Sequence, residues 1–383
     1  MRIRMADIYL VEIPYKQAYK TSTNMTKKGR HVLLRVELED GTEGWGETGI
    51  ISQRYPAEGD SPETIFAVLE HYFCPALIGM CPLVPAVIME VLDRALRGHQ
   101  FAKCAIDHAL LDLQGKILGT SVSNLLGGSH RNEYDVSRSL PIDKPEKVAN
   151  RALQLRDEGY KRLTLKGVGN VTEDYAVFHA VRKALGEGFE LEIDPNGAYD
   201  APSAVNLLRK LEQLDLYAVE QPTAGNDLRA LSEVKSKVSV SVIADESVFT
   251  TRDLREIIKL DAADTICLKP FKNGGILASR KLQHAAECSG LRVSTGSMHP
   301  FGIGTAALHI FAAGISDLMT AGYGSPSERF ADDVVDEASY RFENGTVKIN
   351  NDRPGLGVLV NKSKVQRYTS KYASVSQRNG AIQ

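Results

Sequence analysis

Short apolar runs alternate with amphipathic stretches through the middle of the chain. Five of these runs each end in a polar or charged residue: RLTLK (162–166), LEID (191–194), LYAVE (216–220), VSVIAD (240–245) and TICLK (265–269). Their last residues are 28, 26, 25 and 24 positions apart. Strands that alternate with helices at such a spacing predict a parallel sheet built from right-handed crossover units.

Three further runs, near residues 133–140, 291–295 and 318–321, extend the pattern to eight strands. Eight units predict an α/β fold with a (β/α)8-type TIM barrel. A doubly wound open sheet is the alternative, but it would usually carry a glycine-rich phosphate turn after an early strand. The nearest match is Gly167-Val168-Gly169, which is a weak signal.

The two ends of the chain follow other patterns. Residues 1–50 alternate like strands, with a hairpin signal at Asp40-Gly41, and residues 61–119 are helical. After residue 325 the chain leaves the repeat and contains a second hairpin signal at Asn344-Gly345. We therefore expect an N-terminal α+β capping domain (1–128), the barrel with the catalytic site (129–325), and a C-terminal segment (326–383) that returns to the capping domain and completes it.

Charge and cysteine content narrow the class of protein. The 46 basic residues nearly balance the 48 acidic ones, which argues against nucleic acid as a partner. The five cysteines are scattered without metal-finger spacing, as in a reduced compartment. The N-terminus has no signal-peptide pattern, and no apolar run reaches the length of a membrane span. These features predict a cytoplasmic enzyme that does not bind membranes.

Three carboxylates end successive strands of the predicted barrel: Asp194, Glu220 and Asp245. The active site of such a barrel lies at the carboxyl ends of its strands, so the three groups would converge. Carboxylates this close repel one another unless a cation joins them, and oxygen ligands favour Mg2+ first and Mn2+ second. The alternative is that each acid is a helix cap or a surface charge.

Two lysines flank the carboxylates, at the ends of the second and sixth strands. In a ring of eight strands these positions are opposed, so Lys166 and Lys269 would face a bound ligand from two sides. A lysine beside a cation can act as a base near neutral pH, although a simple salt bridge to the carboxylates is the alternative. The arrangement suits removal of the proton next to a carboxylate, because a metal stabilises the enolate that forms.

These residues resemble the mandelate racemase/muconate lactonizing enzyme family of the enolase superfamily, in its muconate lactonizing enzyme-like subgroup. The motifs that carry the resemblance are GWGE (44–47), AKCAIDHALLDLQGK (102–116), LLGG (125–128), DPN (194–196), EQP (220–222), ADES (244–247), LKPFKNGG (268–275) and PGLG (354–357). Enzymes of this superfamily use a Lys or His base together with Mg2+ that stabilises the enediolate.

The resemblance implies that Asp194, Glu220 and Asp245 bind the metal and that Lys166 and Lys269 are catalytic. Asn196 and Glu246 would support the metal ligands. Two positions depart from the family pattern. Thr164 stands where the family's Lys-x-Lys motif has its first lysine, and Pro300 stands where lactonizing enzymes have an acid.

The family closes two loops of the first domain over the barrel, here residues 19–29 and 51–59. Within the first loop, residues 21–29 are too polar and lysine-rich for a strand, which predicts a solvated loop or a mobile lid. Candidates for contact with substrate are Lys20, Lys27, Lys28, Arg54, Tyr55, Ser297 and His299.

We expect Mg2+-dependent racemisation or epimerisation of a small carboxylate, namely an N-substituted amino acid, a dipeptide or a proline-like acid. A dehydratase acting on a β-hydroxy acid such as a hydroxyproline is one alternative, and a lactonizing cycloisomerase is another. Dimers and octamers are common in the family, which implies a homo-oligomer.

Overall fold

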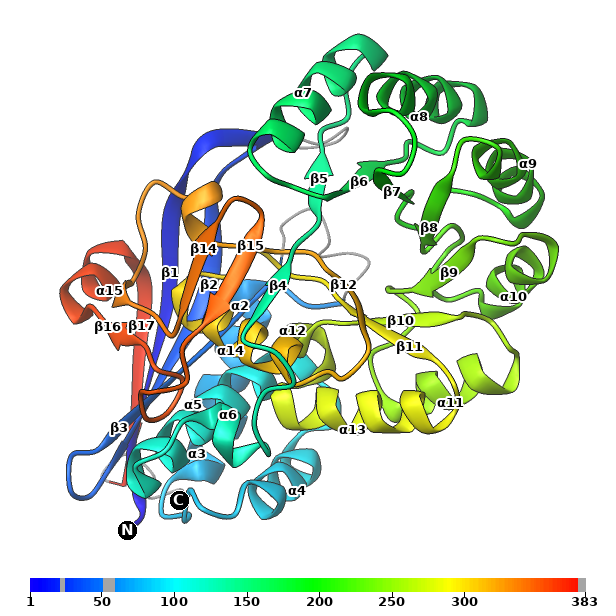
Figure 1. The fold of residues 1–383 in the computed structure, drawn as a ribbon. Helices are drawn as coiled ribbons and strands as arrows, with labels where there is room; N and C mark the ends of the chain where they lie inside the picture. Colours follow the sequence, from blue (N-terminus) through cyan, green and yellow to red (C-terminus); the bar gives the residue numbers. More distant parts are fainter. Residues whose placement is uncertain (21–24, 51–58, 378–383) are drawn as a thin grey trace.

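Two sheets of different kinds organise the chain (Figure 1). The computed structural model describes residues 1–20, 25–50 and 59–377, and of residues 17–20 and 25–26 it describes the backbone alone. A four-stranded antiparallel sheet lies beside an eight-stranded parallel sheet that curls into a ring. None of the helices in these ranges is both long and apolar enough to span a membrane.

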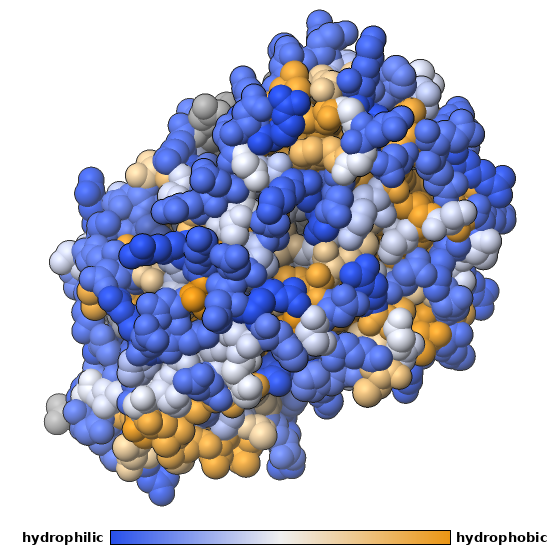
Figure 2. Space-filling model, viewed as in Figure 1, coloured by the Kyte–Doolittle hydropathy of each residue, from blue (hydrophilic) through white to orange (hydrophobic). Residues whose placement is uncertain are grey.

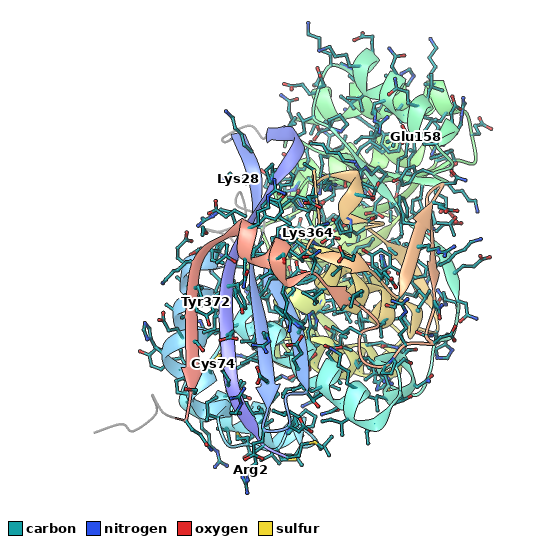
Figure 3. The ribbon with its side chains drawn as sticks, turned by 90° about the vertical axis from the view of Figure 1, so that its left-hand side faces the viewer. Arg2, Lys28, Cys74, Glu158, Lys364 and Tyr372 are labelled. Atoms are coloured by element: carbon teal, nitrogen blue, oxygen red, sulfur yellow. The ribbon has the colours of Figure 1, made fainter. Side chains whose placement is uncertain are left out.

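The antiparallel sheet has the order β17-β1-β2-β3. Its strands are β1 (Ile3–Lys20), β2 (Met25–Leu38), β3 (Glu43–Gly49) and β17 (Thr369–Ser376). Strand β17 comes from the C-terminal segment and pairs antiparallel with β1, as Figure 3 shows. Tyr372 lies at this edge and donates to Asp7 at 2.9 Å. The exact division at residues 128 and 325 stays a prediction.

The β1–β2 hairpin is longer than the sequence predicts. Residues 25–29 were expected in a loop, yet Thr26 pairs with Tyr19 and Gly29 pairs with Ile13. Backbone pairing does not depend on side-chain polarity, so the lysine-rich segment can continue the strand. The expected hairpin at Asp40-Gly41 is confirmed, and Gly41 has a φ of +85°.

Helices of the first domain cover this sheet and lead toward the barrel. They are α2 (Pro62–Val68), η2 (Leu69–Phe73), α3 (Cys74–Leu77), α4 (Pro85–Ala95), α5 (Gln100–Leu118) and α6 (Val122–Leu125). Every residue of α5 from Phe101 to Gly115 is buried. A Cβ at Gly46 would lie 1.9 Å from the Ala105 carbonyl oxygen, so the glycine in GWGE lets β3 approach α5.

The parallel sheet has the order β12-β11-β10-β9-β8-β7-β6-β5. Its strands are β5 (Arg138–Leu140), β6 (Arg162–Lys166), β7 (Glu190–Asp194), β8 (Leu216–Glu220), β9 (Ser241–Ala244), β10 (Thr265–Leu268), β11 (Arg292–Thr295) and β12 (Leu318–Ala321). The amide of Ser137 donates to the Ala321 carbonyl at 2.6 Å and joins the two edge strands. The predicted TIM-barrel architecture is confirmed.

A helix follows each of the first seven barrel strands. These are α7 (Pro145–Asp157), α8 (Val171–Leu185), α9 (Ala201–Glu212), α10 (Leu228–Lys237), α11 (Thr251–Lys259), α13 (Ile276–Cys288) and α14 (Gly302–Ala313), with the short α12 (Pro270–Asn273) before α13. After β12 the described chain forms η3 (Pro326–Glu328) and then turns back toward the first domain. Within the residues that the structure describes, the (β/α)8-type repeat therefore ends without an eighth crossover helix.

The expected first barrel strand, residues 133–140, is divided in two. Strand β4 (Glu133–Asp135) pairs outside the barrel with β15 (Thr346–Ile349), which forms a hairpin with β14 (Tyr340–Glu343). The remaining elements are the short pair β13 (Val335–Glu337) and β16 (Leu359–Val360), followed by α15 (Lys362–Tyr368).

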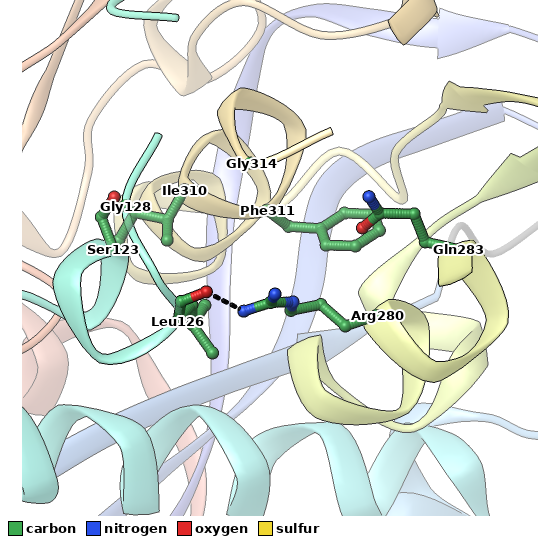
Figure 4. A pocket seen from close by; sticks show the side chains of 8 residues that line it. All are labelled: Ser123, Leu126, Gly128, Arg280, Gln283, Ile310, Phe311 and Gly314. Atoms are coloured by element: carbon green, nitrogen blue, oxygen red, sulfur yellow. Dashed lines mark hydrogen bonds between the residues drawn. The ribbon is translucent and has the colours of Figure 1, made fainter. Parts of the chain in front are cut away.

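The LLGG segment after α6 rests on the barrel helices. Arg280 of α13 donates to the Leu126 carbonyl across a small pocket that Phe311 and Ile310 of α14 also line (Figure 4).

Polar and charged side chains cover most of the face in Figure 2, and an apolar area lies at its lower left. Most apolar residues of the barrel strands are buried, and the carboxyl ends of the parallel strands lie on one side of the barrel.

Candidate active site

The five sequence-predicted residues lie at one edge of the parallel sheet. Lys166, Asp194 and Glu220 are the last residues of β6, β7 and β8, and Asp245 and Lys269 directly follow β9 and β10. Because the strands are parallel and in register, with Lys166 opposite Asp194, their carboxyl ends meet at the same side of the barrel. The structure thus brings the expected residues together.

Lys166 and Asp194 form an ion pair on neighbouring strands. Asn196 supports it, because its side-chain amide donates to the two Asp194 carboxylate oxygens at 2.7 and 2.8 Å and its backbone amide donates at 2.9 Å. The side-chain amide of Asn196 also donates to Glu246 at 3.1 Å. Asn196 has a φ of +50°, a conformation that Asn tolerates better than most residues. It therefore links Asp194 with the segment that follows β9.

Asp245 lies between two lysines. Lys269 pairs with one carboxylate oxygen, and the Nζ of Lys272 lies 2.8 Å from the other. Lys272 also donates to the Asp245 carbonyl, and its side chain is 1% exposed. Lys272 belongs to the LKPFKNGG motif, but the sequence alone predicted no role for it. Its position three residues after Lys269, within the short α12, is the signal that could have indicated it.

Two buried amides, also missed from sequence, hold the loops around Asp245. The Gln221 side-chain oxygen accepts from the amides of Asp245 at 2.9 Å and Ser247 at 3.2 Å. Asn273 accepts from the Lys269 amide at 2.8 Å and donates to the carbonyl of Val248 at 3.2 Å. The Gln in EQP and the Asn in LKPFKNGG therefore fix the positions of a carboxylate and a lysine.

Several acidic side chains lie close together at the ends of β7, β8 and β9. Desolvation, and then Asp194 and Asp245, raise the pKa of Glu220 well above its ordinary value. Burial, opposed by a hydrogen bond with Glu220, raises the pKa of Glu192 to about 7. Glu192 lies two residues before Asp194 on β7, so it points to the same side of the strand, and it is 2% exposed. Sequence reasoning missed it.

The donor atoms suit a divalent cation. Glu220, Asp245 and Cys267 each offer one ligand atom, and these atoms lie within 4.8 Å of one another. Asp194 is outside that group of three in the described structure, because its oxygens face Lys166 and Asn196. Its charge still acts on Glu220. Carboxylate oxygens are the ligands that a hard cation such as Mg2+ prefers, so the residues fit this ion.

Thr164 lies one layer below Lys166, opposite Ser139 and Glu192 in the neighbouring strands. Its hydroxyl is 2.8 Å from that of Ser137, and the residue is 7% exposed. The departure from the family's Lys-x-Lys motif therefore leaves a neutral hydroxyl pair in the barrel where that motif has a lysine.

The substrate-binding candidates differ in what the structure describes. Ser297 and His299 follow β11, and the Ser297 hydroxyl accepts from the His299 amide at 3.3 Å. Burial, and then Arg329 and Arg138, lower the pKa of His299 well below its ordinary value, with a smaller contribution from Lys166.

The first-domain candidates are less fully described. Arg54 and Tyr55 lie outside the described residues, as does the side chain of Lys20 at the end of β1. Lys27 is exposed on β2. Lys28, labelled in Figure 3, pairs with Glu12 at 3.3 Å.

The first domain fixes the loops of the barrel through two buried carboxylates. Glu47 accepts from the amides of Phe301 at 2.6 Å and Gly304 at 2.7 Å, at the start of α14. Asp107 of α5 accepts from the Ile276 amide at 2.6 Å, at the start of α13. Carboxylates at helix N-termini satisfy unpaired amides and complement the helix dipole. GWGE and the α5 motif therefore position the segments that follow β10 and β11.

Known proteins are similar to this chain over nearly its whole length. The family model of the mandelate racemase/muconate lactonizing enzyme N-terminal domain matches residues 5–127, and that of the enolase C-terminal domain-like family matches residues 147–364. The chain is 30% identical to the N-succinyl-L-Arg/Lys racemase of Bacillus cereus over 96% of its own length and 98% of the relative's. It is 32% identical to muconate cycloisomerase 1 of Rhodococcus opacus, over 94% and 96% of the two lengths.

Solved structures agree with these matches. The crystal structure of the Bacillus cereus N-succinyl Arg/Lys racemase has a TM-score of 0.92 at 29% identity, covering 98% of this chain and all of that one. The dipeptide epimerase of Enterococcus faecalis, complexed with Mg and the dipeptide L-Leu-L-Tyr, has a TM-score of 0.88 at 27% identity, covering 94% and 100% of the two chains. The chain belongs to the mandelate racemase/muconate lactonizing enzyme family of the enolase superfamily.

Proposed function

We propose that this protein is a Mg2+-dependent racemase or epimerase that acts at the α-carbon of an N-substituted amino acid or a dipeptide. The observation that carries the proposal is the pair of lysines at the ends of β6 and β10, with β7, β8 and β9 between them. In a closed ring of eight strands these positions are opposed. Two bases on opposite sides of one carbon can remove a proton from one face and return a proton to the other.

Asp194, Glu220 and Asp245 are the residues that would hold the ion. When bound, Mg2+ would supply the positive charge that stabilises the enolate formed from the substrate carboxylate. Burial, and then the charges of Asp194 and Asp245, raise the pKa of Glu220, and the carboxylates gathered around it support a cation at this place. Asn196 and Glu246 keep the carboxylates oriented, and the hydrogen bonds of Asn196 to Asp194 support this assignment. Mn2+ is a weaker candidate, because it is the second choice of the same oxygen set.

The proton moves between the substrate and the Nζ atoms of the two lysines. In one direction Lys166 takes the α-proton and Lys269 donates to the opposite face, and in the other direction the roles are exchanged. Lys269 is 7% exposed at its side chain and Lys166 is 25% exposed. A site that excludes water from one base strengthens the electrostatic interactions around the reacting carbon. A general base positioned in this way contributes about 10²- to 10⁴-fold to the rate.

The relatives support an amino-acid derivative as the substrate. Their names include an N-succinyl-L-Arg/Lys racemase, L-Ala-D/L-Glu epimerases and a hydrophobic dipeptide epimerase. A lactonizing cycloisomerase is the second candidate, because muconate cycloisomerases are similar over nearly the full chain. Pro300 disfavours it, since lactonizing enzymes have an acid at that position.

Proton exchange distinguishes these reactions. Both enantiomers of a panel of N-acylated amino acids and dipeptides are incubated with the protein and Mg2+ in D2O, and the α-proton signal is followed by NMR. A racemase incorporates deuterium at the α-carbon of both enantiomers. A cycloisomerase would instead convert a muconate without exchanging the panel, and a dehydratase would release water from β-hydroxy acids. No exchange in any member of the panel would overturn the proposal.

Assembly into a homo-oligomer remains a proposal that rests on the family alone. Light scattering on the purified chain measures its mass directly. A monomer would contradict this proposal without affecting the assignment of the reaction.

A further inference from the structure

Cys267 lies inside the barrel, directly beneath the carboxylates. It is two residues before Lys269 on β10, so its side chain points to the same side of the strand. It is 2% exposed, and its Sγ lies within 4.8 Å of ligand oxygens of Glu220 and Asp245. The proposed reaction uses Glu220 and Asp245 but gives the thiol no role.

The surroundings of the thiol are apolar and closely packed on one side. Cys267 forms a small buried cluster with Ala218, Ile243 and Met319. A Cβ at Gly296 would lie 3.0 Å from the sulfur, so the glycine after β11 leaves the space that the thiol occupies. The carboxylates of Glu220 and Asp245 are its polar neighbours on the other side. The carboxylates of Glu220 and Asp245 are thus the groups that could bind a metal ion together with the sulfur.

A second buried group supports a cation at this place. Glu192 is 2% exposed and interacts with Glu220 through a side-chain hydrogen bond. Its Oε2 atom is buried, and within the described residues it has no hydrogen-bond partner. A buried carboxylate oxygen without a partner carries a desolvation cost, which a metal ion or a metal-bound ligand would offset. Glu192 therefore adds a fourth possible donor next to Glu220.

We propose that Glu220, Asp245 and Cys267 form a binding site for a thiophilic divalent cation of the Zn2+ and Cd2+ class, which overlaps the Mg2+ site. The inference rests on the proposed function only in that the two sites share Glu220 and Asp245. Thiolate together with carboxylate ligands suits Zn2+ and its heavier analogue, whereas Mg2+ prefers oxygen alone. Binding replaces the S–H bond of Cys267 with an S–metal bond and releases one proton to solvent.

Sharing two carboxylates makes the two kinds of ion mutually exclusive. A thiophilic ion drawn toward Cys267 would sit deeper in the barrel than an ion held by the carboxylates of Asp194, Glu220 and Asp245. We therefore expect Zn2+ or Cd2+ to compete with Mg2+ and to inhibit the reaction rather than support it. The thiol would make the enzyme sensitive to the identity of the available metal.

Cadmium is the probe, because a Cd–thiolate bond gives a charge-transfer absorption in the ultraviolet that carboxylate binding does not. The protein is freed of metal by a chelator and titrated with Cd2+ while this absorption is recorded. We expect one equivalent of Cd2+ to produce the absorption. Added Mg2+ should shift the titration midpoint to a higher Cd2+ concentration. This competition experiment uses the native protein and requires no variant. Absence of the absorption, or a midpoint that Mg2+ leaves unchanged, would overturn the inference.

Two variants at Cys267 test whether its sulfur binds the cadmium ion. Cys267→Ser should abolish the charge-transfer absorption and weaken Cd2+ binding at least about tenfold, the lower range for loss of a group that supports a metal. Cys267→Ala serves as the second replacement if the serine variant does not fold. Cys288→Ser is the matched control, because Cys288 is exposed and far from the site in sequence and should leave the signal intact. A signal that persists in both Cys267 variants would contradict the assignment.

The failure of this inference is distinguishable from the failure of the proposed function. Calorimetric titration with Mg2+ on the same Cys267→Ser protein should give an affinity within about twofold of the native value, because Mg2+ does not depend on sulfur ligands. Mg2+ binding without the cadmium signal rejects the thiophilic site alone. If the native chain does not bind Mg2+, the assignment of the carboxylates as metal ligands is itself rejected.

Discussion

The Nζ atom of Lys272 lies 2.8 Å from the Oδ1 atom of Asp245, and both side chains are 1% exposed. Lys269 occupies the other oxygen of the same carboxylate. One buried carboxylate thus joins a proposed catalytic lysine to a lysine within the short α12. The pair has no access to solvent, so its contribution differs from that of a surface salt bridge.

Replacing Lys272 by Met should destabilise the fold and weaken catalysis. The change leaves Asp245 with one ammonium partner and removes the donor to its carbonyl. Breaking a buried ion pair costs about 3–5 kcal/mol, and we expect the lower end because Lys269 remains. Urea denaturation measures the loss, with Lys281→Met on the exposed side of α13 as the matched control. An unchanged midpoint would show that the Lys272–Asp245 contact does not stabilise the fold.

Replacing Glu47 by Ala should loosen the segment after β11. The substitution leaves the buried amides of Phe301 and Gly304 without an acceptor, and each unpaired group costs about 1–3 kcal/mol. We expect a lower free energy of unfolding and a raised KM, because Ser297 and His299 lie just before these amides. Glu47→Gln keeps one acceptor oxygen and should lose less. Equal losses in the two variants would argue against the capping role.

The buried carboxyl of Asp107 should make the free energy of unfolding depend on pH. Burial raises the pKa of this carboxyl to about 7, although the amides of Ile276 and Leu277 oppose the effect. The folded state therefore binds a proton more tightly than the unfolded state, where the pKa of Asp is about 3.9. Stability from this group is fully present below about pH 4 and is lost as the pH rises to about 7. At about 1.4 kcal/mol for each pKa unit, the full effect is on the order of 4 kcal/mol.

The Asp107→Asn variant isolates this contribution. The amide side chain keeps an oxygen acceptor for the Ile276 amide but does not titrate. The free energy of unfolding of the variant should therefore fall less than that of the native protein between about pH 4 and pH 7. Chemical denaturation at several pH values measures both curves. Parallel curves across this window would contradict the raised pKa of Asp107.

The repeat of strands and the residues at their ends could be predicted from sequence because both depend on local patterns. Alternating apolar runs place Asp194, Glu220 and Asp245 at strand ends, and parallel strands bring such ends together. Thr164 was expected near the site, and the structure places it one layer below Lys166.

Features that depend on distant pairing were not predictable in this way. Strand β4 separates from β5 because it pairs with β15, about two hundred residues later in the chain. Lys272 and Glu192 look like ordinary charges on a helix and a strand, and their burial follows from the closure of the barrel. Glu47 and Asp107 were noted within motifs, but their partners at the starts of α14 and α13 appear only in three dimensions.

The most direct test of the account combines the two lysines with α-proton exchange in D2O. Lys166→Ala and Lys269→Ala are each incubated with Mg2+ and either enantiomer of the best substrate, and Lys281→Ala is the control. Each variant should lose racemisation by about 10²- to 10⁴-fold, the usual contribution of a general base. Each should still exchange the α-proton of one enantiomer, and the two variants should retain opposite enantiomers. Exchange of the same enantiomer by both variants, or racemisation that survives either substitution, would contradict two-sided proton transfer by Lys166 and Lys269.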